Sequence, residues 1–222
     1  RYNVCTNINA TPGTWLGWQT IPNAGQSEAY ALACGNDGRL SIAYLNDNSL
    51  YPANYGDVYF IESTNNGTSF SSPLKIFDAN FTTDSLAGFR GISMVYATNT
   101  PCVAFETVKQ ATDFTYFPGA PSKIRFWSTL LPGTDPNRSV VAVDANRVPF
   151  YPYVGVNDVM APLCRPVIGH AYGEIMIVFM ATSNSVSSSS TPTSYKDIIC
   201  AYGYSNGIYW SISRINPLSP RM

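Results

Sequence analysis

The chain has 222 residues, of which 45% are hydrophobic and only 12% are charged, against roughly 25% charged in an average globular protein. A disordered chain needs low hydrophobicity and high net charge, so this composition excludes disorder. The 13 basic residues nearly balance the 14 acidic ones, giving a formal net charge of −1, and they do not cluster. An electrostatic nucleic-acid binder is therefore excluded.

The predicted secondary structure is all β. Sixteen glycines and sixteen prolines divide the chain into short segments rich in Val, Ile, Tyr, Phe and Thr, which is the pattern of β-strands. The predicted strands cover residues 29–34, 40–45, 58–63, 92–97, 102–107, 124–129, 140–144, 175–181, 198–202 and 209–215. The Ser-rich segment 183–194 predicts a loop. The longest apolar run, 175–181, is far shorter than the roughly 20 residues of a membrane span, so we expect no spanning helix.

These strands repeat three times with one plan. The second strand of each repeat has an aromatic residue at the same position. The third strands have an apolar residue, and the turns after them a glycine, at equivalent positions. The aligned sets are Tyr44, Phe105 and Phe179; Val58, Ile124 and Ile198; and Gly67, Gly133 and Gly207. The last two sets are both separated by 66 and then 74 residues, an agreement that is hard to obtain by accident.

We therefore expect a single all-β region over residues 1–222, made of four-stranded antiparallel repeats. The repeats cover 26–80, 81–146 and 147–222, and residues 1–25 supply the last strand of a preceding repeat.

The turn of the first repeat resembles a known motif. The segment Ser63-Thr-Asn65-Asn-Gly67-Thr-Ser-Phe70 resembles the Asp-box, S-x-D-x-G-x-x-W, of sialidase-like (BNR-repeat) β-propellers, with Asn in place of Asp and Phe in place of Trp. The third repeat keeps Gly207 and Trp210. The resemblance implies propeller blades whose Asp-box turns are structural and bind no substrate. In these turns the Asp or Asn caps backbone N–H groups, the Gly adopts a positive φ and the aromatic residue packs beneath the turn.

Three blades do not close a propeller, which typically has four to eight. Three alternatives follow: the chain is a section of a longer polypeptide, its ends pair with other copies, or the repeats pack as a β-sandwich. The unpaired leading strand and the abrupt final segment 218–222 favour a section of something longer.

The resemblance also supplies candidate site residues. Sialidases bind a substrate carboxylate with three arginines and use a Tyr/Glu nucleophile pair and an Asp acid/base near the propeller axis. Arg90, in the segment 89–92, resembles part of the Phe-Arg-Ile-Pro element of that family, and Arg165 starts the equivalent strand of the third repeat. Two such arginines could clamp an anion. The competing and favoured interpretation is that each pairs with a nearby carboxylate or covers an aromatic side chain.

The sequence does not identify a set of catalytic acid and base residues. The candidates are Glu106, Asp84 and Asp158, with Tyr153 nearby. Glycosidase chemistry depends on the separation of its carboxylates in space, which sequence does not give, and a solvated-loop position is favoured for each. His170 is the only histidine and falls in a turn, so neither a His-dependent hydrolase nor a zinc site is expected.

Other chemistry is weakly indicated. The turns 36–38 and 46–48 are rich in Asn and Asp, as a calcium site would need, but they lack a spaced ligand run and are best interpreted as Asx turns; no cofactor is expected. Five scattered cysteines contain no Cys-x-x-Cys pair, and disulfides are left open. The glycosylation sequons are about as frequent as chance would give, and they lie at Asn9, Asn66, Asn80 and Asn137.

From these observations we expect an extracellular or cell-surface, non-catalytic binding or scaffolding module. It would present aromatic and polar loops to glycans or to neighbouring protein subunits, including further copies of itself through exposed blade edges. The alternative is part of a sialidase-like glycoside hydrolase, although no hydrolase activity is expected from this chain alone.

Overall fold

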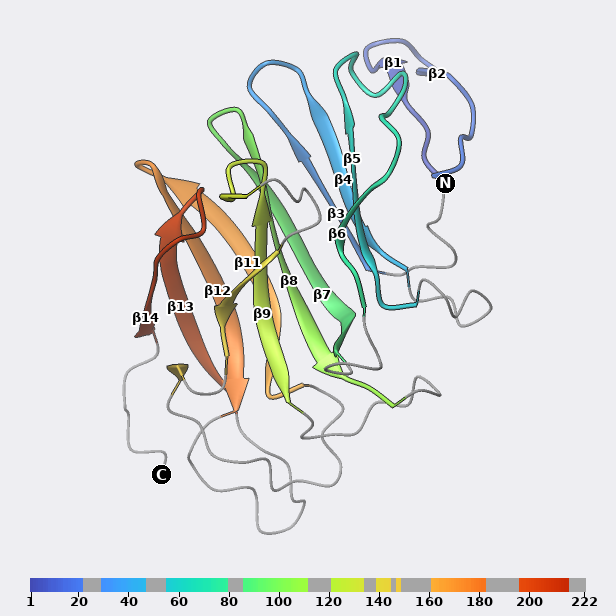
Figure 1. Cartoon of the computed structure of the whole chain (residues 1–222). Coiled ribbons are helices and arrows are strands. Elements are labelled where there is room, and N and C mark those ends of the chain that lie inside the picture. Colours follow the sequence, from blue (N-terminus) through green and yellow to red (C-terminus); the bar gives the residue numbers. More distant parts are fainter. Residues whose placement is uncertain are drawn as a thin grey trace, which may run out of the picture.

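The computed structural model describes residues 1–21, 29–46, 55–79, 86–111, 121–133, 139–144, 147–148, 161–182 and 196–215. These residues form three four-stranded antiparallel sheets and a two-stranded hairpin, and the sheets lie side by side in one row (Figure 1). The predicted all-β fold with four-stranded antiparallel sheets is confirmed. In the described residues no helix is long and apolar enough to cross a membrane.

Each sheet is a meander whose strand order follows the chain. The first contains β3 (Tyr30–Cys34), β4 (Leu40–Leu45), β5 (Val58–Ser63) and β6 (Leu74–Phe77). The second contains β7 (Leu86–Ala97), β8 (Thr100–Lys109), β9 (Ser122–Ser128) and β10 (Val140–Val143). The third contains β11 (Leu163–Ala171), β12 (Glu174–Thr182), β13 (Lys196–Tyr204) and β14 (Trp210–Arg214).

The landmarks of the repeat occupy equivalent places. Val58, Ile124 and Ile198 all lie in the third strand of their sheets. The turn glycines Gly67, Gly133 and Gly207 have φ values of 82°, 119° and 66°, which are left-handed conformations that favour glycine.

The first strands of neighbouring sheets adjoin. β7 lies against β3 of the first sheet and against β11 of the third. Gly88 at the start of β7 donates its N–H at 2.7 Å to the carbonyl of Gly56, which lies in the connection before β5. On the other side of β7, Ser93 Oγ accepts the N–H of Ile168 in β11 at 3.2 Å. Two apolar cores fill the spaces between the sheets, and β8 is buried on both faces. This explains why 102–105 is continuously apolar rather than alternating.

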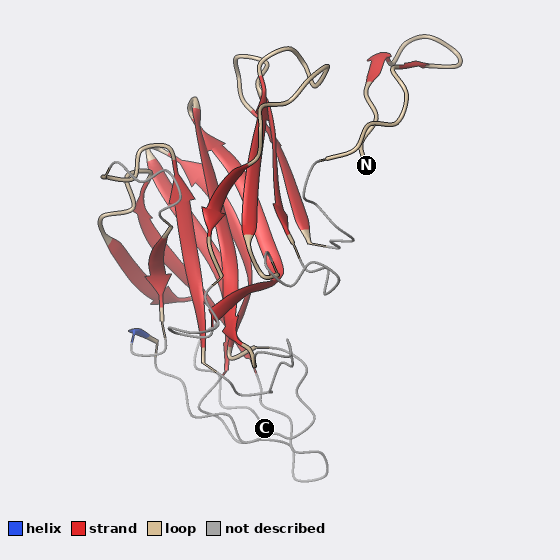
Figure 2. Cartoon of the chain, turned by 45° about the vertical axis from the view of Figure 1, so that its right-hand side comes forward, coloured by secondary structure: helices blue, strands red, loops and turns tan. Residues whose placement is uncertain are grey.

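The N-terminal segment lies beside the first sheet. Its hairpin pairs β1 (Cys5–Asn7) with β2 (Thr14–Trp15), and its tip points away from the sheets (Figure 2). Val4 lies 3.2 Å from the position of a Cβ at Gly67, much as Leu131 of the second sheet lies against Gly207 of the third. At this one contact, the N-terminal segment therefore occupies the position that a preceding sheet would occupy.

No disulfide joins the five cysteines, which settles the question that the sequence left open. Cys102, Cys164 and Cys200 are buried, Cys5 is half-buried and Cys34 is exposed.

Candidate functional site

Two bulges mark one end of the sheets, the end at which β8 and β12 terminate and β7 and β11 begin (the lower end in Figure 1). In β7 the register shifts between Gly88 and Ile92, so three residues lie opposite one of β8. In β11 the register shifts between Cys164 and Val167. Bulges re-aim side chains and are frequent near functional sites. Here they contain the two arginines that the sequence singled out, Arg90 and Arg165.

Glu106 of β8 connects the two bulges. Its Oε2 accepts the backbone N–H of Arg165 at 2.6 Å, and its carboxylate also accepts the backbone N–H of Gly91. The side chain is almost completely buried, with 2% of the residue exposed. Gly91 is required by this close approach, because a Cβ there would lie 2.6 Å from Glu106 Oε2 and 2.7 Å from Cδ of Pro166.

Burial dominates the electrostatics of this carboxylate. Loss of solvent raises the pKa of Glu106 above its ordinary value, and the N–H groups of Arg165 and Gly91 lower it in part. The positive charges of Arg165 and Arg90 act in the same lowering direction. Because the carboxylate is enclosed, it acts on the bulges and has little surface to offer a substrate.

Both arginine side chains are exposed. The guanidinium of Arg90 lies over the ring of Phe89, 5.0 Å from its centroid. In the described part of the chain, neither Arg90 nor Arg165 forms a salt bridge. An exposed guanidinium group has the chemistry to bind an external anion.

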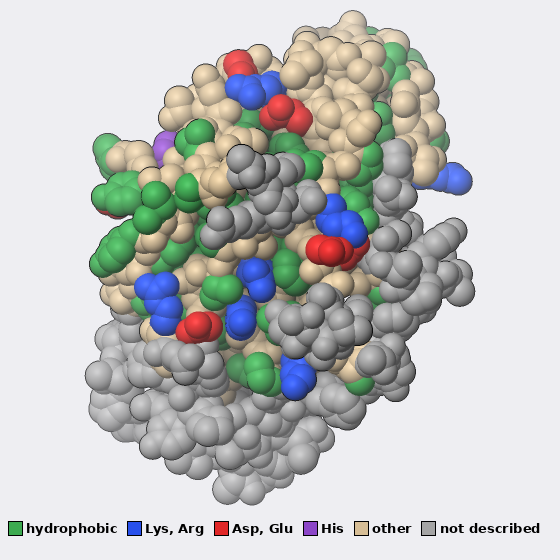
Figure 3. All heavy atoms as spheres, in the orientation of Figure 1, with side chains coloured by type: hydrophobic (Ala, Val, Ile, Leu, Met, Phe, Trp, Pro, Cys, Tyr) green, Lys and Arg blue, Asp and Glu red, His purple; other side chains and the backbone are tan. Residues whose placement is uncertain are grey.

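Lysines add positive charge to the same end. Lys109 ends β8, and Lys123 and Lys196 lie at the starts of β9 and β13. Figure 3 shows several Lys and Arg side chains on the lower half of the described surface in this view.

Arg90 of β7 and Arg165 of β11 both lie beside Glu106 of β8, although their predicted role in binding an anion stays a prediction. Other predicted site residues lie outside the described residues: Asp84, Tyr153, Asp158, Asn80 and Asn137. His170 pairs with Ile175 beside the β11–β12 turn, at the opposite end. Asn9 and Asn66 are exposed, and their glycosylation stays a prediction.

The Asp-box-like turn makes local contacts. Ser63 Oγ accepts the N–H of Gly67 at 2.9 Å, and Asn65 Oδ1 accepts the N–H of Ser69 at 2.9 Å. The ring of Phe70 lies 4.9 Å from that of Tyr2 in an edge-to-face contact. These bonds hold the turn itself together.

In the third repeat, Trp210 is buried and its ring lies 5.0 Å from that of Phe126 in the second sheet. The aromatic residue of this turn therefore joins two sheets.

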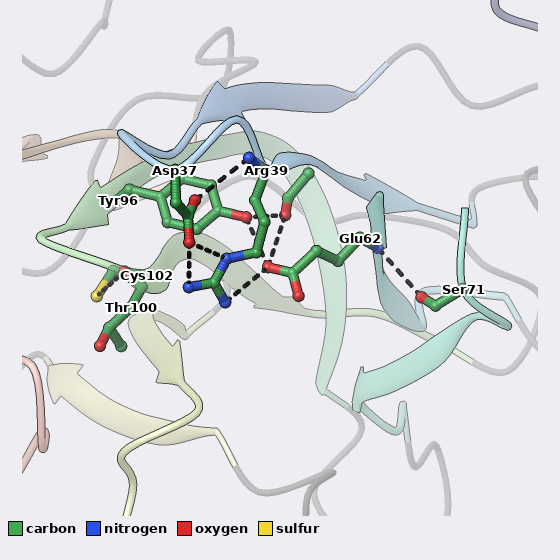
Figure 4. Close-up of polar contacts among 8 residues, drawn as sticks. Asp37, Arg39, Glu62, Ser71, Tyr96, Thr100 and Cys102 are labelled. Carbon is green, nitrogen blue, oxygen red and sulfur yellow. Dashed lines mark hydrogen bonds and ion pairs between the residues drawn. The ribbon is translucent and has the colours of Figure 1, made fainter. Parts of the chain in front are cut away.

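A polar cluster lies between the first two sheets, where the sequence predicts none (Figure 4). Arg39 pairs with Asp37 at 2.7 Å and lies 3.8 Å from Glu62, whose Oε1 accepts the hydroxyl of Tyr96 at 2.6 Å. Burial and the bond to Glu62 raise the pKa of Tyr96. The spacing of Asp37 and Arg39 across a turn was the available signal. Asp37 belongs to a turn considered for calcium, but Arg39 binds its carboxylate; in the described part of the chain no three potential ligands gather.

A second ion pair stabilises the first sheet. The carboxylate of Asp57 is 1% exposed and lies 2.7 Å from Nζ of Lys75. It also accepts the N–H of Ala79 at 2.8 Å and the hydroxyl of Tyr59 at 3.2 Å. Asp78, a second partner of Lys75 at 2.8 Å, is 70% exposed.

No protein-family model matches the chain, and no curated protein matches its sequence. Its structure is similar to solved ones. An inulosucrase from Halalkalicoccus jeotgali bound to kestose has a TM-score of 0.53 at 10% identity, covering 88% of this chain and 54% of that one. An exo-1,5-α-L-arabinanase from a bovine ruminal metagenomic library has a TM-score of 0.51 at 9% identity, covering 95% and 66%.

A polysaccharide lyase of family PL25, an ulvan lyase, has a TM-score of 0.50 at 12% identity, covering 86% of this chain and 44% of that one. The chain thus spans 44% to 66% of the length of these three structures. They establish a β-propeller-type fold of four-stranded sheets, without singling out the sialidase or BNR group.

The expectation of a non-catalytic binding or scaffolding module is contradicted by these comparisons. The similar structures described above are enzymes that act on glycans, an arabinanase and an ulvan lyase among them. The expectation rested on the few charges of the chain, on the strand edges left by an incomplete set of blades and on the many tyrosines, and the sequence showed no catalytic set to weigh against them. In this fold the side chains of one site come from separate strands, here β7, β8 and β11, so their sequence spacing carries little information.

Proposed function

We propose that this chain is part of a glycan-processing enzyme of β-propeller type, a glycoside hydrolase or a lyase, and that Arg90 and Arg165 bind the anionic group of an acidic sugar. The observation that carries the proposal is the junction of β7 and β11, where one buried carboxylate, Glu106, holds two bulges that each present an arginine. The three sheets would then be blades of the propeller.

The two arginines have the chemistry for this role. A guanidinium binds a carboxylate or sulfate through two parallel N–H bonds, and it stays charged at any physiological pH. Lys109, Lys123 and Lys196 at the same end raise the local concentration of an anion.

Glu106 is a positioning residue in this proposal. Because it is 2% exposed, it acts through the backbone N–H groups of Arg165 and Gly91. Asp84, Asp158 and Tyr153 stay candidates for the acid, base and nucleophile. A sialidase-type exo-glycosidase is included among the candidate reactions because segment 63–70 resembles the Asp-box.

Calorimetric titration tests the proposal, with N-acetylneuraminate and D-glucuronate as acidic probes and D-glucose as the neutral one. We expect an acidic sugar to bind more tightly than glucose. Arg90→Gln or Arg165→Gln should weaken that binding roughly 10- to 100-fold, since a hydrogen bond to a charged group contributes about 1.5–3 kcal/mol. Arg1→Gln, which changes an exposed arginine at the N-terminus, is the matched control.

Equal affinity for acidic and neutral sugars, or unchanged affinity in both variants, would contradict the proposal. Turnover of fluorogenic sialosides, aryl glycosides and uronate-containing polysaccharides then separates a hydrolase from a lyase, because only a lyase creates an unsaturated product that absorbs ultraviolet light.

A further inference from the structure

Arg165, one of the two arginines of the proposed anion site, has an unusual backbone conformation. In the described part of the chain, four non-glycine residues have a positive φ. Asn66, Thr98 and Tyr172 lie in turns, where a left-handed residue helps to reverse the chain. Arg165 has a φ of 52° inside β11, at the bulge of that strand. Among the described residues it is thus the one non-glycine residue that adopts this conformation within a strand.

This conformation is unfavourable for Arg165 on two grounds. The Cβ of an L-residue is crowded in the left-handed region, and a residue that precedes a proline, here Pro166, favours an extended backbone. A bulge that starts with a left-handed residue normally has glycine at that place. A non-glycine residue held there lowers the folding equilibrium constant about fivefold or more. Such conformations persist only where the surrounding structure enforces them, and they are frequent at ligand sites.

Two buried oxygen acceptors of the second sheet hold the backbone at this bulge. Glu106 of β8 accepts the N–H of Arg165 through Oε2 at 2.6 Å. Ser122 of β9 accepts the N–H of Leu163 through Oγ at 2.7 Å. Because Glu106 and Ser122 are only 2% and 4% exposed, loss of either acceptor would leave an N–H group buried without a partner. The backbone is therefore fixed at two N–H groups, one on each side of Cys164.

The position of β11 in its sheet makes these N–H groups accessible to side chains. β11 pairs with β12 alone, and a strand with one neighbour has N–H groups that the ladder does not use. Besides Leu163 and Arg165, Ile168 donates its N–H to the second sheet, to Oγ of Ser93 at 3.2 Å. Ser93 therefore holds β11 after the bulge, whereas Ser122 holds it before the bulge.

We propose that Ser122 is a positioning residue of the anion site. Together with Glu106 it keeps Arg165 in the left-handed conformation, and this conformation sets the direction of the exposed arginine side chain. When the bond to Leu163 is lost, the bulge relaxes towards an extended backbone, and the guanidinium no longer points to the anion. The inference rests on the proposed function, because it takes Arg165 as a ligand of the anion.

Calorimetric titration of the whole chain with N-acetylneuraminate and D-glucuronate tests this role. Ser122→Ala should weaken binding of the acidic sugar about tenfold, because a misdirected arginine loses a hydrogen bond to a charged group. Ser122→Thr keeps the hydroxyl and should bind within about threefold of the wild type. The matched control is Ser93→Ala, which removes the same kind of bond on the other side of the bulge and should keep the wild-type affinity.

Urea unfolding of the same variants separates positioning from stability. Both alanine variants should raise the equilibrium constant for unfolding about fivefold, since each leaves a backbone N–H of β11 without its acceptor. A loss of stability is then common to Ser122→Ala and Ser93→Ala, while a loss of affinity is confined to Ser122→Ala.

A second comparison reports on the backbone of Arg165 without any ligand. Arg165→Gly should lower the equilibrium constant for unfolding about fivefold relative to Arg165→Gln, because glycine adopts a positive φ without crowding. In the Ser122→Ala background the same comparison should give less than about a twofold difference, since the bulge has already relaxed.

The outcomes distinguish this inference from the proposed function. A wild type that binds no acidic sugar would contradict the proposed function and, with it, the role of Ser122 in an anion site. Where the wild type binds, an unchanged affinity in Ser122→Ala would overturn the positioning role alone. Equal losses of affinity in Ser122→Ala and Ser93→Ala, or in Ser122→Ala and Ser122→Thr, would overturn it as well. A glycine effect at residue 165 that is the same with and without the Ser122 hydroxyl would show that Ser122 does not hold the bulge.

Discussion

Replacing Glu106 by Gln isolates the charge of the buried carboxylate, since the amide keeps the size of the side chain and removes its proton equilibrium. Burial raises the pKa of Glu106 above the ordinary value of 4.5. The folded state therefore holds the proton to a higher pH than the unfolded chain. The stabilisation due to this proton is fully present below pH 4.5 and is lost as the pH rises through the folded pKa.

The size of this pH dependence follows from the single proton that Glu106 binds. Between the two pKa values the free energy of unfolding of the wild type should fall with a slope of up to about 1.4 kcal/mol per pH unit on account of Glu106. The Gln variant lacks this contribution. It also exchanges a charge-assisted hydrogen bond from the Arg165 N–H, now 2.6 Å long, for a neutral one, which offsets part of its gain at neutral pH. The difference in stability, variant minus wild type, should thus increase from pH 4.5 towards 7.

Urea unfolding followed by tryptophan fluorescence at half-unit pH steps measures this difference. Glu174→Gln, at an exposed glutamate of β12, is the control for the same exchange of a carboxylate for an amide at the surface. A difference between Glu106→Gln and wild type that stays constant or decreases with pH would refute the assignment of a raised pKa.

Three further predictions concern stability and use the same urea assay. Gly91→Ala should lower the free energy of unfolding by about 1–3 kcal/mol, because the new methyl group overlaps a buried carboxylate and a proline ring. Gly169→Ala, where a methyl group would have no atom within 4 Å, should change it by less than about 0.5 kcal/mol, and equal effects of the two variants would contradict the overlap. Asp57→Ala should lower the free energy of unfolding by about 3–5 kcal/mol, because Lys75 loses its enclosed partner. Asp78→Ala, which removes the exposed partner, should lower it by less than about 1 kcal/mol, and the reverse order would show that the exposed pair dominates. Ser63→Ala should cost about 1–2 kcal/mol, because the N–H of the glycine in its turn loses its acceptor, and a neutral effect would show that water replaces the hydroxyl.

The internal repeat allowed the all-β fold of four-stranded sheets to be predicted from the sequence. Corresponding landmarks such as Val58, Ile124 and Ile198 lie in the third strand of each sheet because the same side-chain pattern must satisfy the same packing in each. The predicted strand ends were less accurate than the predicted order of the strands. β7 begins at Leu86 rather than at Ile92, since a bulge around Arg90 interrupts the alternation that marks a strand.

The site was predicted in part. Arg90 and Arg165 were singled out by resemblance, and Glu106 was named as an acid/base candidate, but its link to the arginines runs through backbone N–H groups that no side-chain pattern encodes. The pairing of Tyr96 with Glu62 was likewise invisible, because 34 residues separate them and only the packing of the first two sheets joins them.

The burial of β8 on both faces has a consequence for the dynamics of the row of sheets. Each sheet is stabilised by its neighbours, so opening should begin where a neighbour is lacking and proceed sheet by sheet. The outermost strand of the third sheet, β14, then exchanges its backbone amide hydrogens through local opening, while β8 exchanges its own only when the whole molecule unfolds. Among the described strands we therefore expect the slowest-exchanging amides on the strand that carries Glu106, which would anchor the proposed anion site to the most persistent part of the fold.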